Sequence, residues 1–363
     1  MKRSFFLTAV VLCVASVAVA GTNAPYGINA HVPSTQLLDM LAAAGIQWVR
    51  VDMNWFQLEP GRNQYNWGYM DNVVNAARAR GLQIFATLAY SPNWASGTAN
   101  IADPPQDPND WYNFVYNVVR RYKSSVKHWG MWNEPNLDGF WTGEAWQYRE
   151  WILKNGYNAA KAADASCVVL GPELAHMSGW PDFMENVMAE GGANYIDIIT
   201  HHCYKGDTGT EVFNYLDKDA FYWAWDDPPL MKVLDDLGVD NRPVWLTEVG
   251  WTTADGDGSV SEDEQADYYH QLLWGVHERA WLERVFPYEA MDDPTPGVPK
   301  WGIIKADYTP KKAYTEYQSF IDNPTDPGSS GGCGAAEDTS KPQAELALVF
   351  LVPLAGFILR RRR

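Results

Sequence analysis

Eight short apolar runs, each followed by a longer amphipathic stretch, constrain the fold of this 363-residue chain more than any other feature. Most of the runs are almost continuously hydrophobic, as parallel strands buried on both faces are. Strands that alternate with helices form parallel sheets with right-handed crossovers. Eight such units predict a single-domain α/β fold, a closed (β/α)8 TIM barrel, rather than an open doubly wound sheet. The predicted strands are 26–31, 48–54, 83–90, 128–133, 167–172, 197–204, 243–248 and 284–290.

The stretches between these runs carry helical periodicity and helix-end signals. In 68–80 the apolar residues recur at helical spacing, and Gly81 follows as a stop signal. Ser261 and Glu264 have the spacing of a capping box, which predicts the start of a helix. No Gly-x-Gly-x-x-Gly turn follows the first strand, so the pattern disfavours a dinucleotide-binding fold. The predicted helices are 35–44, 68–80, 111–123, 146–163, 181–190, 228–237, 261–280 and 311–321.

The N-terminal residues have the pattern of a secretory signal peptide. Lys2 and Arg3 precede an apolar run, which ends in small residues up to Ala20. This pattern predicts a signal peptide at 1–20 with cleavage after Ala20, and a retained N-terminal anchor is the alternative.

The C-terminal end has three parts. A linker rich in Pro, Gly, Ser and acidic residues covers 322–345 and contains Cys333. An apolar segment and four arginines follow in 346–363; the segment is shorter than the ~20 residues that span a bilayer, although arginine side chains can snorkel. This tail resembles the tripartite sorting tails of some Gram-negative bacteria and predicts secretion with anchoring at the cell surface. A weak permanent membrane anchor is the alternative. Residues 21–321 are the predicted barrel.

Charge and cysteine usage narrow the choice of partners. The chain has 28 basic and 45 acidic residues and a net charge of −17 at pH 7. Such a chain repels nucleic acids and anionic membrane surfaces, so we expect a neutral substrate and membrane contact only through the tail. Within the predicted barrel, Cys167 and Cys203 lie at different levels of neighbouring parallel strands, too far apart for a disulfide. Both are therefore predicted to be buried free thiols.

Polar residues follow the predicted strands at the end where barrel active sites form. Strand four ends in Asn133 and Glu134 among several tryptophans, before Pro135, which cannot continue a central strand. Burial among indoles predicts a raised pKa for Glu134, as a general acid requires. Strand seven ends in Thr247 and Glu248. Two glutamates that face each other across the barrel mouth suit glycoside hydrolysis, whereas a strand-end Glu that points at water is the structural alternative.

These motifs resemble those of barrel glycoside hydrolases with catalytic glutamates on strands four and seven. The chain looks closest to the cellulase family 5 and β-xylosidase family 39 types. The resemblance covers about 25–321 and implies a retaining β-glycoside hydrolase that acts on a β-linked oligo- or polysaccharide of xylan, glucan or mannan type by double displacement. It is carried by Trp-Asn-Glu-Pro-Asn at 132–136 and Thr-Glu-Val-Gly-Trp at 247–251, with support from Arg50, Ser-Pro-Asn-Trp at 91–94, His-Cys-Tyr at 202–204 and Trp-Gly-Ile-Ile at 301–304.

The resemblance implies a role for each matching residue. Glu134 would be the acid/base and Glu248 the nucleophile. Asn133 would hydrogen-bond the sugar 2-hydroxyl, an interaction that strengthens in the transition state. Tyr204 would bond to Glu248, and Arg50 would lie beneath it, where a cation lowers a carboxylate pKa.

Several candidates have a structural alternative. Arg50 could form a salt bridge inside the barrel. His202 would contact the substrate or support Glu134, or be a hydrogen-bonded core histidine, whereas His201 is expected to face the helices. Aromatic residues beyond strand ends provide either sugar-stacking platforms or packing. These residues are Trp94, Trp141, Trp225, Trp251 and Trp301, together with Tyr288.

No cofactor and no metal site are predicted. The acidic loop at Asp255 and Asp257 hints at calcium but lacks the rest of a binding loop, so we expect a turn. The expected partner is a carbohydrate, and the expected catalytic domain is monomeric. Two other functions use the same barrel: a non-catalytic glycan-binding protein, and a transglycosylase in which a sugar replaces water as acceptor. The sequence leaves open the sugar, the linkage and whether chain ends or interiors are cut.

Overall fold

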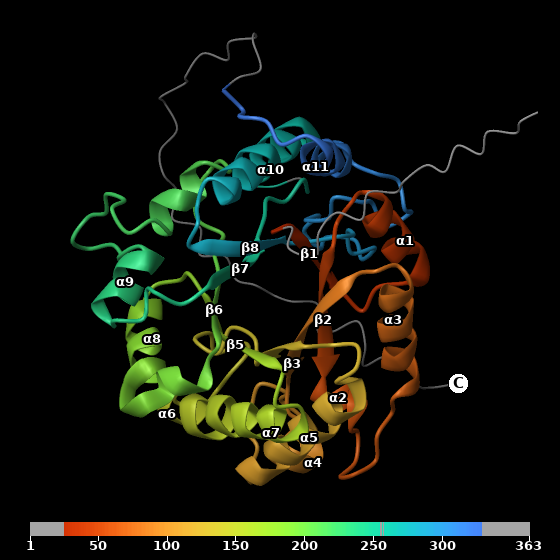
Figure 1. Ribbon diagram of the computed structural model, residues 1–363, viewed down its shortest axis with the longest axis vertical. Helices are drawn as coiled ribbons and strands as arrows, with labels where there is room; N and C mark the ends of the chain where they lie inside the picture. Colours follow the sequence, from red (N-terminus) through yellow and green to blue (C-terminus); the bar gives the residue numbers. More distant parts are fainter. Residues whose placement is uncertain (1–24, 255, 257, 329–363) are drawn as a thin grey trace, which may run out of the picture.

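The computed structural model describes residues 25–254, 256 and 258–328 (Figure 1). The view runs along a barrel, with the strands around its centre and the helices outside them. The predicted signal peptide, Cys333, the C-terminal apolar segment with its arginines, and the acidic residues Asp255 and Asp257 lie outside the described residues. None of the described helices is both long enough and apolar enough to cross a bilayer.

Eight parallel strands pair in sequence order, which confirms the predicted (β/α)8 barrel. A bridge between Tyr26 and Val285 brings the last strand against the first. Most strand interiors are buried on both faces, as their continuous hydrophobic runs predict. The strands are β1 (Gly27–His31), β2 (Trp48–Asn54), β3 (Gln83–Ala89), β4 (His128–Met131), β5 (Val168–Ala175), β6 (Ile198–His202), β7 (Val244–Val249) and β8 (Leu282–Pro287).

Helices alternate with the strands and cover the outside of the barrel (Figure 1). The predicted capping box forms at α10, where Ser261 Oγ accepts from the Glu264 N–H and the Glu264 side chain accepts from the Ser261 N–H. The long helices are α1 (Thr35–Ala43), α3 (Gly68–Ala79), α5 (Pro108–Tyr122), α7 (Asn155–Ala163), α8 (Trp180–Met188), α9 (Leu230–Asp236), α10 (Glu262–His277) and α11 (Lys312–Asp322). Shorter segments are α2 (Trp55–Leu58), α4 (Asn93–Ser96), α6 (Ala145–Gln147), the π-helix η1 (Tyr148–Lys154) and the 3₁₀ segments η2 (Ala189–Tyr195) and η3 (Glu211–Tyr215).

Three boundaries differ from the sequence prediction. β4 ends at Met131, before Pro135, because Trp132 already has a φ of 81°. β5 continues beyond Pro172, and its register with β6 shifts at Glu173, where φ is 54°. The predicted helix 146–163 is divided by a π-helical turn. Two of these changes place glutamates at the C-terminal end of the barrel.

The two predicted free thiols are confirmed, since Cys167 and Cys203 are both buried and unpaired. The N-terminal end of the barrel interior is closed by a cluster that we call the aromatic plug. Its rings are packed edge to face or stacked at centroid distances of 5.4–5.8 Å. The plug consists of Trp48, Phe85, Leu170, Ile198, Trp245 and Phe286, all buried. Among the described residues, this end of the barrel interior is therefore filled by side chains.

Candidate active site

A cavity of about 180 Å³ opens at the C-terminal ends of the strands. This is the end at which (β/α)8 enzymes place their chemistry. Its lining combines charged and hydrogen-bonding groups with aromatic rings, the composition that suits a polyhydroxylated ring with apolar C–H faces. The lining residues are His31, Arg50, Asp52, Asn54, Phe56, Thr87, Ala89, Tyr90, Ile101, Asn133, Glu134, Phe140, Tyr204, Glu248 and Tyr288.

Asn133 and Glu134 reach this cavity because the backbone turns sharply after β4. Trp132 and Glu134 have φ values of 81° and 43°, in the left-handed region that non-glycine residues rarely occupy. The Glu134 N–H donates to the Glu173 carbonyl at 3.0 Å, so the turn stays hydrogen-bonded to the end of β5. The Trp132 ring lies 5.1 Å from Trp141, and both rings are buried in the core. Trp141 therefore serves packing, while the two residues after Trp132 line the cavity.

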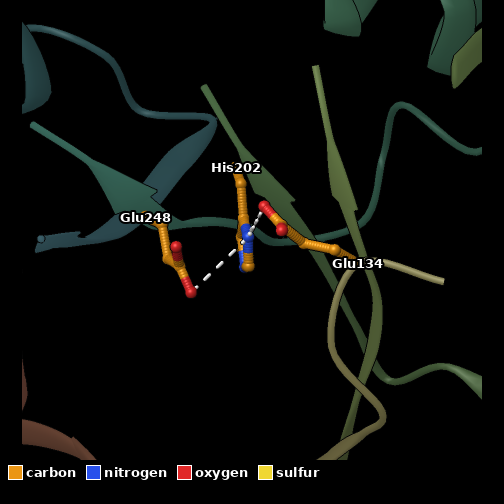
Figure 2. Close-up of side chains that lie close together, drawn as sticks. All are labelled: Glu134, His202 and Glu248. Carbon is orange, nitrogen blue, oxygen red and sulfur yellow. Dashed lines mark hydrogen bonds and ion pairs between the residues drawn. The ribbon is translucent and has the colours of Figure 1, made fainter. Parts of the chain in front are cut away.

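Glu134 is only 3% exposed, and its partner is His202 at the end of β6. His202 Nδ1 lies 2.9 Å from Glu134 Oε1. Figure 2 shows this interaction as a dashed line between the two side chains. Burial raises the pKa of Glu134, and the His202 contact offsets this only in part. Burial lowers the pKa of His202, but the Glu248 charge, the hydrogen bond to Glu134 and the nearby Glu173 carboxylate raise it to about 9. The imidazole is therefore protonated at neutral pH. His201 packs against Trp180 of α8, outside the barrel, as predicted.

Glu248, near the end of β7, is held by two donors from other strands. Arg50 Nη1 donates to Oε1 and the Tyr204 hydroxyl donates to Oε2, both at 2.7 Å. Burial raises the pKa of Glu248, but the charges of His202 and Arg50 outweigh it, and the net pKa is lowered. Oxygens of the two glutamates and a nitrogen of His202 lie within 4.8 Å of one another (Figure 2). The site thus pairs a carboxyl that favours the protonated form with a carboxylate that favours the ionised form.

Arg50 connects this pair to residues that the sequence analysis missed. Its Nη2 donates to Glu173 Oε2 at 2.7 Å, and its Nη1 donates to Asn29 Oδ1 at 2.8 Å. Nη2 also donates to Asn133 Oδ1 at 2.7 Å. The one sequence signal that Asn29 faces the barrel interior is its position two residues before His31 on a strand. Glu173 was missed because it follows Pro172, at which we expected β5 to end. Arg50 is a salt-bridged interior residue, and it also touches a candidate catalytic carboxylate.

His31 was also missed, and it forms a charged network at the cavity wall. Its Nδ1 lies 2.8 Å from Asp52 Oδ2 and its Nε2 lies 2.9 Å from Glu289 Oε2. Burial lowers the pKa of His31, but these two carboxylates raise it well above the usual value. Burial raises the pKa of Asp52, but His31 and Arg50 outweigh it and lower the pKa. The network offers both donors and acceptors to hydroxyl groups.

The predicted aromatic residues divide into two groups. Tyr204 and Tyr288 line the cavity. Trp301 packs against both, with ring centroids 5.4 Å and 6.2 Å away. Trp94 and Trp251 are not among the lining residues, and each donates its indole N–H to a loop carbonyl. The structure therefore brings Trp301 next to the site and leaves the other two tryptophans in the surrounding packing.

One group in the described part of the chain has metal-ligand spacing, and it is the same Glu134, His202 and Glu248. Arg50 already supplies a cation to Glu248 at 2.7 Å, and His202 bonds to Glu134. A divalent ion there would face the positive charges of both Arg50 and His202. We therefore assign these side chains to proton transfer and charge balance.

A sequence profile for glycosyl hydrolases family 39 matches residues 36–269. The chain belongs to glycosyl hydrolase family 39. The sequence motifs alone resembled both the family 5 and the family 39 types, and the profile match identifies family 39.

Individual relatives of this family 39 chain are distant. A β-xylosidase of Caldicellulosiruptor saccharolyticus is 28% identical over 176 residues, which cover 44% of this chain and 36% of that protein. An endo-1,4-β-xylanase 5-like protein of Arabidopsis thaliana is 24% identical over 248 residues, which cover 62% of this chain and 39% of that protein. The chain thus spans well under half the length of these curated relatives.

Solved structures share the fold. A family 39 glycoside hydrolase from Bacteroides cellulosilyticus WH2 has a TM-score of 0.66 at 21% identity and covers 82% of this chain and 63% of its own. A monomeric β-xylosidase from Caulobacter crescentus CB15 has a TM-score of 0.63 at 20% identity and covers 83% of this chain and 68% of its own. At these identities the likeness concerns the barrel alone.

Proposed function

We propose that this family 39 chain is a retaining β-glycoside hydrolase that acts on β-linked, xylan-type oligo- or polysaccharides. The observation that carries the proposal is the pair of carboxylate oxygens, from Glu134 and Glu248, within 4.8 Å of each other. Retaining enzymes hold their carboxyl groups about 5–5.5 Å apart, whereas inverting enzymes need about 6.5–9.5 Å to admit a water molecule. The short separation supports direct attack by one carboxylate.

The pKa shifts divide the two roles. Glu134, whose pKa is raised by burial, is the group that protonates the departing glycosidic oxygen. Glu248, whose pKa is lowered by His202 and Arg50 despite burial, is the group that attacks the anomeric carbon. Glu134 then removes a proton from the water that releases the sugar from Glu248. The two steps together return the site to its starting state, with Glu134 protonated and Glu248 ionised.

Asn133 is placed to bind the sugar ring between these two groups. Its Oδ1 accepts from Arg50 at 2.7 Å, and its Nδ2 donates to the Tyr90 hydroxyl at 3.1 Å. An amide nitrogen carries two hydrogens, so one remains for the substrate. In this orientation the free N–H suits the 2-hydroxyl next to the reacting carbon, where hydrogen bonds strengthen in the transition state.

The substrate class follows from relatives and from the cavity. Matched proteins include β-xylosidases and endo-1,4-β-xylanases. The cavity combines the charged His31 network with aromatic rings such as Phe56 and Tyr90, which supports binding of a neutral sugar by hydrogen bonds and ring stacking. The roles of Tyr288 and Trp301 in this proposal are to shape the wall beside Tyr204.

The test uses Glu248→Ala with aryl β-xylosides and xylo-oligosaccharides. We expect wild-type protein to give products of retained configuration, and the variant to lose activity by about 10⁴-fold or more. Added azide should restore turnover, because a small anion fills the space of the lost carboxylate. The product should be the α-configured glycosyl azide, which has the inverted configuration. Rescue with retained configuration would exclude Glu248 as the nucleophile.

The same measurements separate the alternatives. A wild-type protein that binds xylan without hydrolysing any β-glycoside in a broad panel would be a glycan-binding barrel. Formation of products longer than the starting oligosaccharide, at high acceptor concentration, would identify a transglycosylase.

A further inference from the structure

Glu173 is a third buried glutamate for which the proposed reaction has no direct use. Its side chain has no exposure to solvent. Oε2 accepts from Arg50 Nη2 at 2.7 Å, from Arg50 Nε at 3.2 Å and from Thr87 Oγ1 at 3.1 Å. A buried charge is retained only where paired and hydrogen-bonded, because desolvation is costly. The three donors meet this requirement.

The fold makes room for this carboxylate. A Cβ atom on Gly130 of β4 would lie 2.0 Å from Glu173 Oε1, so only glycine fits there. The Glu173 N–H donates to Thr200 Oγ1 at 3.0 Å, and its carbonyl accepts from the Glu134 N–H at 3.0 Å. The residue holds a φ of 54°, a strained conformation outside glycine that persists only where the surrounding structure enforces it. Neighbouring strands β4 and β6 thus both fix its position.

Glu173 lies between the supporting groups of both candidate catalytic glutamates. Through Arg50 it is one residue away from Glu248. On the other side, its Oε2 is 3.8 Å from Nε2 of His202, whose Nδ1 contacts Glu134. His202 Nε2 is buried and has no hydrogen-bond partner of its own, so the Glu173 carboxylate is the anion that faces it.

We propose that Glu173 is a positioning residue whose buried negative charge holds two cations, Arg50 and His202, beneath the catalytic pair. This inference rests on the proposed function. The carboxylate fixes the guanidinium that touches Glu248 and balances an imidazolium that would otherwise lose its proton inside the protein.

Removing the negative charge of Glu173 should lower the pKa values of its neighbours. An anion favours bound protons on its neighbours, so its loss makes every nearby group release protons at lower pH. The active site needs Glu134 protonated and Glu248 ionised, so both limbs of the pH profile should move to lower pH. The titratable or charged groups around Glu173 are Arg50 on β2, Glu134 after β4, Tyr148 on η1, His202 on β6 and Glu248 on β7.

The test compares Glu173→Gln with Glu173→Asp. The Gln variant keeps the shape without the charge, and we expect its alkaline limb in kcat/KM to move down by about 1–3 pH units. The Asp variant keeps the charge and shortens the reach, so we expect a lower kcat with the limbs unmoved. A Gln variant with wild-type limbs, or an Asp variant with wild-type kcat, would overturn the proposal.

Asp292→Asn is the matched control, because Asp292 is another buried carboxylate, paired with Lys311 at 2.8 Å. It should lose stability without any shift of the limbs. NMR titration of His202 gives a readout that needs no turnover: its pKa should fall from about 9 in Glu173→Gln. A wild-type protein with no glycosidase activity would refute the proposed function, while the NMR result still decides the role of Glu173.

A second observation concerns the surface, where Phe221, Tyr222, Trp223 and Trp225 form an exposed aromatic tip. These residues lie in the loop between β6 and α9, which extends outward beside α9 (Figure 1). Phe221, Trp223 and Trp225 are 73%, 54% and 77% exposed. The Trp223 and Trp225 rings are parallel at 4.9 Å, and Phe221 meets Trp223 edge-on at 5.0 Å.

We infer separately that the aromatic tip binds a neutral polysaccharide chain apart from the cavity. The large exposed apolar side chains of the tip are all aromatic, and aromatic ring faces stack on the C–H faces of sugars. The flanking residues Asp219, Asp226 and Asp227 supply acceptors for hydroxyl groups and repel anionic lipids and nucleic acids. This inference also rests on the proposed function, since a polymer substrate is the expected ligand.

The test is sedimentation with insoluble xylan in the inactive Glu248→Ala background. We expect Trp223→Ala with Trp225→Ala to weaken polymer binding at least about tenfold, because stacked aromatic rings are large contributors to recognition. In the active enzyme, kcat/KM on a small aryl xyloside should not change. Trp146→Ala, which removes a tryptophan that is 48% exposed elsewhere, is the control. Unchanged polymer binding in the double variant would overturn the inference. It would also be overturned if the two substitutions instead abolished dimer formation, measured by size, or binding to neutral lipid vesicles.

Discussion

The two ends of the barrel interior differ in chemistry although the same strands build them. At the N-terminal end the aromatic plug is apolar and buried. Two residues further along β2, Trp48 gives way to Arg50, and three residues along β7, Trp245 gives way to Glu248. One end therefore contributes burial of apolar surface, and the other contains buried charges that cost free energy unless paired. Burial of apolar surface in the plug therefore offsets part of the free-energy cost of the buried charges at the other end.

The backbone shows the same division. Five non-glycine residues near the cavity have a positive φ: His31, Tyr90, Trp132, Glu134 and Glu173. No plug residue does. Each such conformation costs about 1–3 kcal/mol and persists only where surrounding structure enforces it. The strain is thus concentrated where side chains must turn toward the substrate.

After Glu248→Ala, the largest effect on activity is expected for Glu134→Gln. Without a proton donor, kcat/KM on unactivated xylosides should fall by about 10²–10⁴-fold. Substrates with a good leaving group need less protonation and should lose less. Because ionisation of Glu134 sets the alkaline limb, that limb should disappear. A variant with an intact alkaline limb would show that another group donates the proton. Stability should change little, since burial raises the pKa of Glu134 and glutamine has the shape of the protonated side chain.

The opposite outcome is expected for Trp245→Ala in the plug. Trp245 is 1% exposed and packs against Trp48, Phe85 and Phe286. Its loss should lower the free energy of unfolding by about 3–5 kcal/mol, measured by denaturant titration. Below the transition, kcat/KM should stay near the wild-type value, because the cavity lies at the other end. A large fall in kcat/KM with normal stability would break the division between the two ends. As a surface control, Trp146→Ala should change stability by less than about 0.5 kcal/mol.

The sequence predicted the barrel strands and the candidate catalytic pair for different reasons. β2 was predicted with its observed bounds because its apolar residues Trp48, Val49, Val51 and Met53 carry their own strand signal. Glu134 and Glu248 were chosen as candidates because each stands in a recognisable motif, and the structure places both in the cavity. Glu173 was missed because it follows Pro172 inside an apolar run, and its positive φ has no signal in the sequence. Trp94 and Trp251 were chosen for their loop positions, but the direction of a loop side chain depends on backbone turns that the sequence does not specify.

Tyr204→Phe tests a single hydrogen bond at the catalytic end. The lost hydroxyl donates to ionised Glu248 at 2.7 Å, and a bond to a charged group contributes about 1.5–3 kcal/mol. Its removal should raise the pKa of Glu248, so the acid limb of kcat/KM should move to higher pH. We expect a loss of about tenfold or more near neutral pH. An acid limb that stays in place would mean that Arg50 and His202 alone keep Glu248 ionised.

The smallest effect is expected for Trp94→Phe, which bears on the aromatic residues outside the cavity. Trp94 donates its indole N–H to the Glu59 carbonyl at 2.7 Å, and Arg62 lies 4.7 Å from the ring centroid. Losing that hydrogen bond should cost about 0.5–1.5 kcal/mol of stability in thermal or chemical unfolding. Kinetics on both aryl xylosides and xylan should be unchanged, because the ring does not line the cavity. A KM that rises for xylan but not for the aryl xyloside would instead show that Trp94 contacts the polymer. The substrate-binding region would then extend beyond the strand ends to the residues around α4.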